Sequence, residues 1–284
     1  MMRKFLILLM LLALIRFSVA DDLTKPQHIA SLNLCVDALL LKLVEPERIA
    51  SLTYLSANSQ FSPFSEEAKN FTINHGLAED LVPLNPDLIL AGDFGATDAK
   101  ALLRQLGFRV ETLSLPQTLE EIVAHIRRLG ELTGSQLSAE SMASNLEKQI
   151  ARLDAQKQDQ ELIPAFWYSS NSVVVGDHTL ENELMTRAGF YNLALDQHIN
   201  GFAQLDLEDL ILAKPEVLII EASDVPAFSL AQEYVHHPAL SKNNVKILTL
   251  PATLSVCIAP IATDVIDNLI QQKQKLQEER LQKK

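Results

Sequence analysis

The stretches Glu79–Leu90 (EDLVPLNPDLIL) and Glu208–Ile219 (EDLILAKPEVLI) follow the same pattern. Each starts with Glu-Asp-Leu, reaches a proline followed by an acid, and ends in an apolar run. The acids favour the start of a short helix, because the helix dipole is positive there, and the proline ends that helix. The apolar run is typical of a buried parallel strand. Any α/β lobe can contain one such unit by coincidence, but two copies favour two related α/β lobes.

Strands and helices alternate around the first unit. The pattern predicts strands at His28–Leu34, Arg48–Tyr54, Asp87–Gly92 and Phe108–Leu113, and helices at Cys35–Val44 and Thr97–Leu106. Continuous apolar strands with long connections are typical of a parallel sheet with helical crossovers. Residues 21–117 are therefore expected to form an N-terminal lobe with a parallel sheet.

The middle of the chain is helical and charged. Leu119–Leu132 has helical spacing, Gly134 interrupts it, and Ser138–Gln158 continues as a long helix with almost no β-branched residues. Such a segment is either a peripheral helix of one domain or a connection between two lobes. We favour a connecting region over residues 118–160, because strand–helix alternation restarts directly after it.

Residues 161–284 are expected to form a C-terminal lobe and a final helix. The predicted strands are Ile163–Ser169, Ser172–Val175, Val217–Glu221 and Val245–Leu250. Pro260–Gln274 begins a final helix that runs into a basic tail ending at Lys283-Lys284.

The first twenty residues have the pattern of a secretory signal peptide. Arg3 and Lys4 precede the apolar run Phe5–Ile15, and Ser18-Val19-Ala20 places small residues before a cut at Asp21. Eleven apolar residues are too few to span a bilayer. We expect cleavage after Ala20 and a protein that works in a bacterial periplasm.

Composition excludes several common functions. The 284 residues include 24 Lys and Arg against 36 Asp and Glu, a net charge of −12, which disfavours nucleic-acid binding. Only nine residues are glycine, and the motifs GxGxxG, GxxxxGK[ST], GxSxG, HExxH and CxxC are all absent from the sequence. The seven histidines form no H-x-H or H-x-x-x-H pair, so we expect no dedicated metal site. His75 and His178 stay minor candidates for ligand contact. The expectation is a protein that is not an enzyme and has no resident cofactor.

Several short motifs, taken in order, resemble the substrate-binding proteins of ATP-binding-cassette importers for cobalamin, ferric siderophores and haem. The motifs are Ile29–Asn33, Pro46–Ile49, Glu79 with Leu84–Leu88, Leu119–Glu120 through Leu129–Gly130, and Glu208 with Leu212–Glu216. The resemblance runs from about His28 to Leu269, and its specificity comes from the order and spacing of the motifs.

The resemblance implies an α/β fold in which two Rossmann-like lobes with parallel sheets are joined by a long backbone helix. It also implies a ligand cleft between the lobes and a monomer that delivers a small metal chelate to an inner-membrane permease without catalysis. By motif position, Glu79 and Glu208 match the two lobe glutamates that dock onto arginines of the permease.

Ligands of open α/β sheets bind beyond the carboxyl ends of the strands, so these ends supply candidate ligand contacts. The candidates are Asn33, Leu34, Cys35, Tyr54, Asp93 and Phe94 in the first lobe, and Trp167, Tyr168, Ser223 and Cys257 in the second.

Two of these candidates are the adjacent aromatic residues Trp167 and Tyr168. Core packing accounts for most aromatic residues, but alternation along a strand puts one of this pair on each face. We therefore expect at least one ring in the cleft, where it suits a flat macrocycle or a catecholate chelate. The candidate set contains no arginine for an anionic chelate, so it leaves the identity of the ligand open.

The two cysteines, Cys35 and Cys257, border the expected cleft from opposite lobes. Cysteine pairs in the periplasm usually oxidise. Three interpretations remain open: a disulfide that fixes the lobe spacing, a thiol pair that touches the ligand or a metal, and two unrelated buried cysteines. The alternative function uses the same pair: an exported thiol-dependent redox protein or enzyme, favoured by the position of Cys35 at a helix start, which lowers a thiol pKa.

Overall fold

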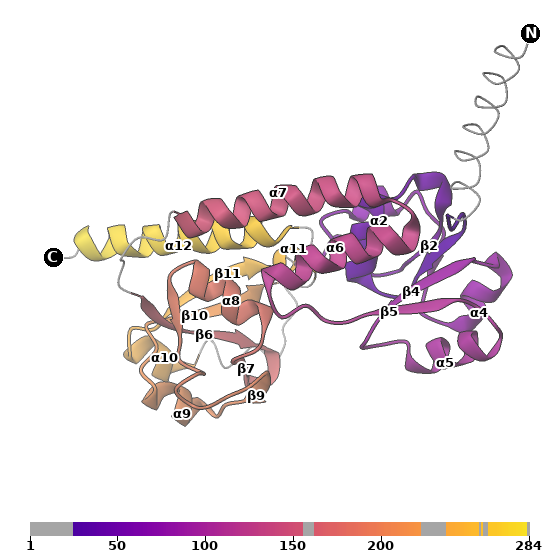
Figure 1. The fold of residues 1–284 in the computed structure, drawn as a ribbon. Helices are drawn as coiled ribbons and strands as arrows, with labels where there is room; N and C mark the ends of the chain where they lie inside the picture. The colour runs from indigo at the N-terminus through magenta and orange to yellow at the C-terminus, as the bar shows by residue number, and fades with distance from the viewer. Residues whose placement is uncertain (1–24, 156–161, 223–236, 256, 258–260, 283–284) are drawn as a thin grey trace, which may run out of the picture.

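The computed structural model describes residues 25–155, 162–222, 237–255, 257 and 261–282, and it contains two α/β lobes connected by long helices (Figure 1). The predicted signal peptide, residues 1–20, lies outside the described residues. In the described part of the chain, no helix combines the length and apolarity needed to cross a membrane.

The N-terminal lobe contains a five-stranded sheet in the order β3-β2-β1-β4-β5, with every pair parallel. This arrangement confirms the predicted parallel sheet. Its strands are β1 (Ile29–Ser31), β2 (Ile49–Thr53), β3 (Ile73–Asn74), β4 (Leu88–Gly92) and β5 (Val110–Leu113). Its helices are α2 (Leu34–Leu43), α3 (Ser65–Ala68), α4 (Ala78–Leu81) and α5 (Thr97–Gln105), with single 3-10 turns at Pro46–Arg48 and Val82–Leu84.

Helix α2 begins directly after β1 because Asn33 caps it. The Asn33 side-chain oxygen accepts hydrogen bonds from the backbone N–H groups of Cys35 at 3.0 Å and Val36 at 3.1 Å. Gly92 makes room for this cap, since a Cβ at that position would lie 2.6 Å from the Asn33 amide nitrogen. The carboxyl ends of β1 and β4 are therefore held against each other at the edge where a ligand is expected.

Asp37, one turn into α2, is a fully buried carboxyl group. Its Oδ2 accepts hydrogen bonds from the Thr53 hydroxyl at 2.5 Å and from the Thr53 backbone N–H at 3.1 Å. Burial raises the pKa of Asp37 to about 7, and the hydrogen bonds from Ser31 and Thr53 only partly offset that effect. The folded protein therefore holds this proton over a pH range in which the unfolded chain has lost it.

We expect the free energy of unfolding to fall as pH rises from about 4 to about 7, by at most about 4 kcal/mol. The sign follows because the folded-state pKa of Asp37 lies above the unfolded value, so the stabilisation is complete at low pH and is lost through the folded pKa. Asp37→Asn should flatten this dependence in urea unfolding at pH 5 and pH 8. The exposed Asp267→Asn is the control, and an unchanged slope in Asp37→Asn would contradict the assignment.

The C-terminal lobe contains a mixed six-stranded sheet in the order β11-β10-β6-β7-β9, with β8 also paired to β6. Its strands are β6 (Ile163–Ser169), β7 (Val173–Val175), β8 (Phe190–Asn192), β9 (Phe202–Gln204), β10 (Val217–Ala222) and β11 (Lys246–Pro251). Its helices are α8 (Leu180–Arg187), α9 (Leu207–Leu212), α10 (Pro238–Lys242) and α11 (Ala252–Ser255), with a 3-10 turn at Ser170–Ser172.

This second sheet refines the expectation of parallel sheets. Strands β8, β10 and β11 are in parallel pairs, but β7 runs antiparallel to both β6 and β9. The reversal between β6 and β7 occurs at Asn171 and Ser172, whose φ values are 61° and 60°. Two consecutive left-handed residues match the twist of a tight β-hairpin, so the chain turns back without a crossover helix.

The repeated sequence pattern forms the same local structure in both lobes. Helix α4 leads to β4, and α9 leads to β10. The residue before the proline is left-handed in both copies, with φ 46° at Asn85 and 53° at Lys214. The similarity of the two stretches therefore extends to the backbone.

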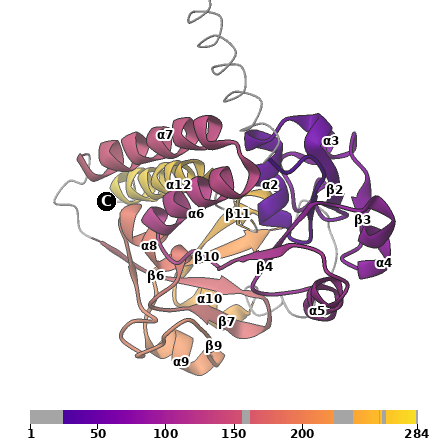
Figure 2. The same ribbon diagram turned by 45° about the vertical axis from the view of Figure 1, so that its right-hand side comes forward.

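The connecting region consists of two helices, α6 (Leu119–Thr133) and α7 (Gln136–Ala155), and a third long helix, α12 (Ala262–Gln282), runs beside α7 (Figures 1 and 2). Gly134, with φ 71°, ends α6. Arg127 on α6 binds Glu140 and Glu147 on α7 and joins the two helices. Helix α12 continues to Gln282, through the basic stretch into which the sequence predicted that it runs.

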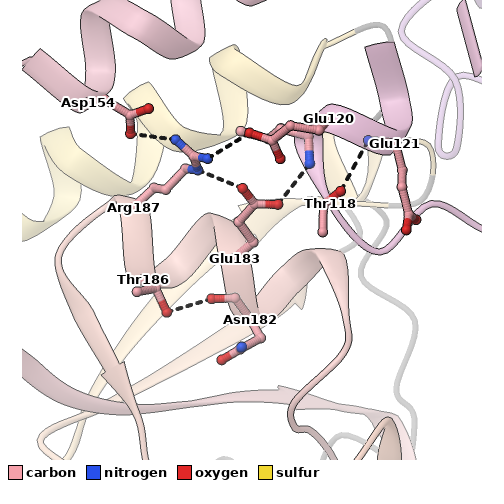
Figure 3. A network of polar contacts seen from close by, with 9 residues as sticks. Thr118, Glu120, Glu121, Asp154, Asn182, Glu183, Thr186 and Arg187 are labelled. Carbon is pink, nitrogen blue, oxygen red and sulfur yellow. Dashed lines mark hydrogen bonds and ion pairs between the residues drawn. The ribbon is translucent and has the colours of Figure 1, made fainter. Parts of the chain in front are cut away.

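One guanidinium group attaches the connecting helices to the C-terminal lobe (Figure 3). Arg187 on α8 binds Glu183 at 2.7 Å, Asp154 of α7 at 2.5 Å and Glu120 of α6 at 3.2 Å. Glu183 also accepts a hydrogen bond from the backbone N–H of Leu119 at 2.8 Å. Because charge-assisted bonds to a planar guanidinium are directional, this network fixes how α8 sits against both helices.

The largest apolar core runs through both lobes and the helices between them. It includes Ile29 of β1, Leu129 of α6, Leu146 of α7, Trp167 of β6 and Val265 of α12, all of them buried. The two sheets and the helices therefore pack as one continuous unit, which favours a fixed lobe spacing.

Candidate ligand-binding site

A cavity of about 570 Å³ lies between the two lobes. The first lobe contributes the ends of β1, β4 and β5 and the start of α2, the connecting region contributes α6, and the second lobe contributes the segments around α8, β9 and α11. The lining residues are Asn33, Cys35, Val36, Leu39, Gly92, Asp93, Phe94, Leu113, Ser114, Leu115, Pro116, Gln117, His125, His178, Thr179, Leu180, Glu181, Asn200, Gly201, Phe202 and Ser255.

A buried lysine holds the wall formed by the first lobe. The Lys100 ammonium on α5 donates to the backbone oxygens of Gly92 at 2.8 Å and Asp93 at 2.9 Å. These bonds satisfy the carbonyls at the end of β4 and fix the start of the following loop. Phe94 in that loop is 74% exposed, so its ring is available on the cavity wall.

The opposite wall is held by the cap of α8 and by backbone bonds. The Thr179 hydroxyl donates to the Gly176 oxygen at 2.8 Å and accepts from the Asn182 backbone N–H at 3.2 Å. Phe202, at the start of β9, is 56% exposed and also lines the cavity. Each lobe therefore presents one exposed aromatic ring.

A disulfide bond joins the lobes beside the cavity. Cys35 at the start of α2 is bonded to Cys257, which follows α11, and their Cα atoms lie 5.0 Å apart. This confirms the first of the three interpretations of the cysteines, and the interpretation as a free thiol pair is wrong. Cys35 and Ser255 both line the cavity, so the bond lies next to the expected ligand.

Burial shifts the pKa values of three titratable groups in or near the cavity. Burial raises the pKa of Glu181, and the nearby carboxylate of Glu221 raises it further. Burial also raises the pKa of Glu221, partly offset by the Trp167 indole, and burial lowers the pKa of His125. None of the described residues that line the cavity is lysine or arginine. The described wall therefore contains the carboxyl groups of Asp93 and Glu181 and no lysine or arginine that could pair with an anionic ligand.

Four of the predicted contacts lie on the cavity wall: Asn33, Cys35, Asp93 and Phe94. Cys257 adjoins it through the disulfide. Leu34 lies next to the cap residue but is buried and does not line the cavity. Ser223 lies outside the described residues.

The aromatic residues of β6 require a correction. Trp167 and Tyr168 are only 1% and 5% exposed, and neither lines the cavity. Alternation does place them on opposite faces, in different apolar clusters, but both faces of this central strand are covered. Tyr54 is also not on the wall; its ring stacks on His75 with centroids 5.6 Å apart.

The sequence reasoning missed several lining segments. Leu113–Gln117 starts at the last residue of β5. Applying the strand-end rule to this strand as well would have identified the segment from the sequence. Thr179–Leu180 follows the short β7. Asn200–Phe202 could not be found in this way, because β9 runs antiparallel to β7 and its amino end therefore lies beside the carboxyl end of β7 at the cavity. Of the two histidines on the wall, only His178 was a candidate.

The remaining predicted residues, Glu79 and Glu208, stand away from the cavity. Glu79 is exposed in the first turn of α4, and Glu208 is exposed in the first turn of α9. The described residues contain no group of three or more His, Cys, Asp or Glu side chains that could hold a metal ion.

Residues 29–250 match the family described as periplasmic binding protein. The chain belongs to this family. A curated relative from Photorhabdus laumondii, named vitamin B12-binding protein, is 25% identical over 204 residues, which cover 70% of this chain and 72% of the relative. A cobalamin-binding protein of Halobacterium salinarum is 22% identical over 209 residues, and the match spans 55% of that longer protein.

Solved structures share the fold. The haem-binding protein RhuT from Roseiflexus sp. RS-1 has a TM-score of 0.69 at 20% identity, covering 86% of this chain and 98% of its own. The vitamin B12-binding protein BtuF of Vibrio cholerae has a TM-score of 0.68 at 19% identity, covering 87% and 96%. These structures confirm the two-lobed α/β architecture predicted from the sequence.

Proposed function

We propose that the chain captures a small metal chelate in the cavity between its lobes and delivers it to the permease of an ABC importer. The observation that carries the proposal is a pair of exposed aromatic rings, Phe94 and Phe202. They come from opposite lobes and line the same cavity. Flat, largely apolar ligands bind well between aromatic faces. The relatives named for cobalamin and vitamin B12, and the structures named for haem, support this ligand class.

A corrinoid fits the charge of the cavity best among these chelates. Carboxylates of haem or of an anionic siderophore call for a cation, and the described lining residues supply no lysine or arginine. The amide side chains of a corrinoid carry no charge and need no cation on the cavity wall. Burial raises the pKa of Glu181, so this wall residue holds its proton to higher pH than an exposed glutamate does.

The expected place of action is the periplasm, reached through the signal peptide at residues 1–20 with cleavage after Ala20. The chain works there as a monomer and presents Glu79 and Glu208 to the permease. One acidic helix start on each lobe suits a partner surface with two arginine clusters.

Removing both rings should weaken chelate binding without weakening the fold. In calorimetric titrations with cyanocobalamin, haemin and a ferric catecholate, we expect the wild type to bind cyanocobalamin most tightly. Phe94→Ala with Phe202→Ala should reduce that affinity by about 10- to 100-fold, because two ring contacts are lost. Both side chains are exposed, so unfolding should be nearly unchanged.

The control is Leu106→Ala, which changes an exposed apolar residue of the N-terminal lobe that does not line the cavity. It should bind as the wild type does. Full affinity in the double phenylalanine variant would contradict the assignment of the cavity as the ligand site.

A further inference from the structure

Two of the segments that line the cavity belong to different parts of the fold. Leu113–Gln117 runs from the end of β5 in the first lobe towards α6, and Thr179–Glu181 contains the cap and the first residues of α8 in the second lobe. A chelate in the cavity lies between these two segments. Its affinity therefore depends on how far apart they are held and on how much they move.

One carboxylate bonds the helices that follow these two segments. Oε2 of Glu183, on α8, accepts a hydrogen bond from the backbone N–H of Leu119 at 2.8 Å. Leu119 is the first residue of α6 and is fully buried, and an N–H at a helix start has no acceptor within its own helix. The Thr118 side chain accepts the N–H of Glu121 at 3.1 Å. The start of α6 is therefore capped both by its own chain and by the second lobe.

Arg187 fixes the position of that carboxylate (Figure 3). Its Nε donates to Oε1 of Glu183 at 2.7 Å, so both oxygens of Glu183 have a partner, one on α8 and one on α6. The remaining guanidinium nitrogens bind Asp154 of α7 and Glu120 of α6. The side chains of Arg187 and Glu183 are only 17% and 18% exposed, so solvent screens this ion pair less than it screens a surface pair.

Apolar packing by itself does not determine how α6 sits against α8. Leu119 and Leu184 belong to the same buried cluster, but apolar attraction is not directional. The disulfide joins α2 to the segment after α11, so it acts on other parts of the cavity wall. Charge-assisted hydrogen bonds depend on both distance and angle. The bonds of Glu183 and Arg187 therefore fix the register between α6 and α8.

We infer that Glu183 and Arg187 are positioning residues for the ligand: they hold the two wall segments at the separation at which both contact the captured chelate. The inference rests on the proposed function, since it needs a chelate in the cavity. Neither residue lines the cavity, so both act through the segments whose helices they bond. Because the walls are held in place before the chelate arrives, less conformational entropy is lost on binding.

Calorimetric titration with cyanocobalamin, haemin and a ferric catecholate tests the inference on whichever chelate the wild type binds most tightly. Glu183→Ala and Arg187→Ala should each weaken binding by about 10-fold, with unchanged stoichiometry. Glu183→Gln keeps one acceptor oxygen and should recover part of the affinity. The double variant Glu183→Ala with Arg187→Ala should bind within about twofold of either single variant, because the two residues act as one unit. A merely structural role would instead lower the fraction of molecules that bind.

Arg127→Ala is the matched control for Arg187→Ala. Arg127 on α6 also binds two carboxylates, those of Glu140 at 2.9 Å and Glu147 at 2.8 Å, but both lie on α7. The control therefore removes a similar guanidinium network from the connecting helices without breaking a bond to the second lobe. It should bind the chelate within about twofold of the wild type. Urea unfolding of every variant checks that each is folded under the titration conditions.

The outcomes separate the two proposals. If the wild type binds a chelate and Glu183→Ala and Arg187→Ala bind it equally tightly, the inference is overturned and the proposed function stands. An equal loss of affinity in Arg127→Ala, or a loss of stoichiometry in place of affinity, overturns the inference in the same way. If the wild type binds none of the three chelates, the proposed function fails and the inference fails with it.

Discussion

Replacing both cysteines, Cys35→Ser with Cys257→Ser, is expected to lower the free energy of unfolding by about 3–5 kcal/mol. The disulfide closes a loop of 222 residues, so breaking it releases much conformational freedom in the unfolded chain. It also joins the start of α2 to the segment after α11, across the two lobes. Urea unfolding at neutral pH, followed by circular dichroism, measures the loss.

The wild type supplies its own control for this prediction. Both cysteines of the chain are in the bond, so a reducing agent should bring the wild type close to the variant and leave the variant unchanged. Equal stability of the oxidised wild type and the double variant would show that the connecting helices and their core alone set the stability of the fold.

Reversing the charge of both lobe glutamates should reduce chelate uptake by cells to background. Glu79→Arg with Glu208→Arg places cations where the proposed permease surface is also cationic, and like charges across an interface are strongly unfavourable. Both residues are exposed and away from the cavity, so chelate affinity of the purified protein should stay within about twofold. Uptake of labelled chelate and calorimetry measure the two effects separately.

The control variant Glu47→Arg with Glu278→Arg makes the same change in net charge at exposed sites outside α4 and α9. It should transport as the wild type does. Normal uptake by the Glu79 and Glu208 variant would refute the docking assignment, and equal loss in both variants would show that overall charge is responsible.

The sequence was sufficient to predict the two lobes. Periodic apolar runs and the repeated acidic helix start reflect local rules, and these rules hold in α4 with β4 and in α9 with β10. The hairpin at Asn171 and Ser172 was missed, because two left-handed residues between apolar runs leave only a weak local signal. That hairpin makes the second sheet mixed.

The site was only partly predictable, because the burial and pairing of strands do not follow from local sequence patterns. The strand-end rule finds a position along a strand, and it succeeded for Asn33, Asp93 and Phe94. It says nothing about which faces of the sheet are covered, so Trp167 and Tyr168 were expected near the ligand although both are buried. Phe202 lies at the amino end of β9, which reaches the cavity beside the carboxyl end of β7 because these two strands are antiparallel, and that pairing is not visible in the sequence.

Binding of a metal chelate between the lobes is the central claim, and a visible absorption spectrum tests it directly. Protein isolated from its native host is mixed with cyanocobalamin, haemin or a ferric catecholate, separated from unbound chelate by gel filtration, and its spectrum is recorded. We predict that the protein retains one equivalent of chelate, with the bands of a corrinoid. A protein that elutes colourless after each of the three additions would contradict the account.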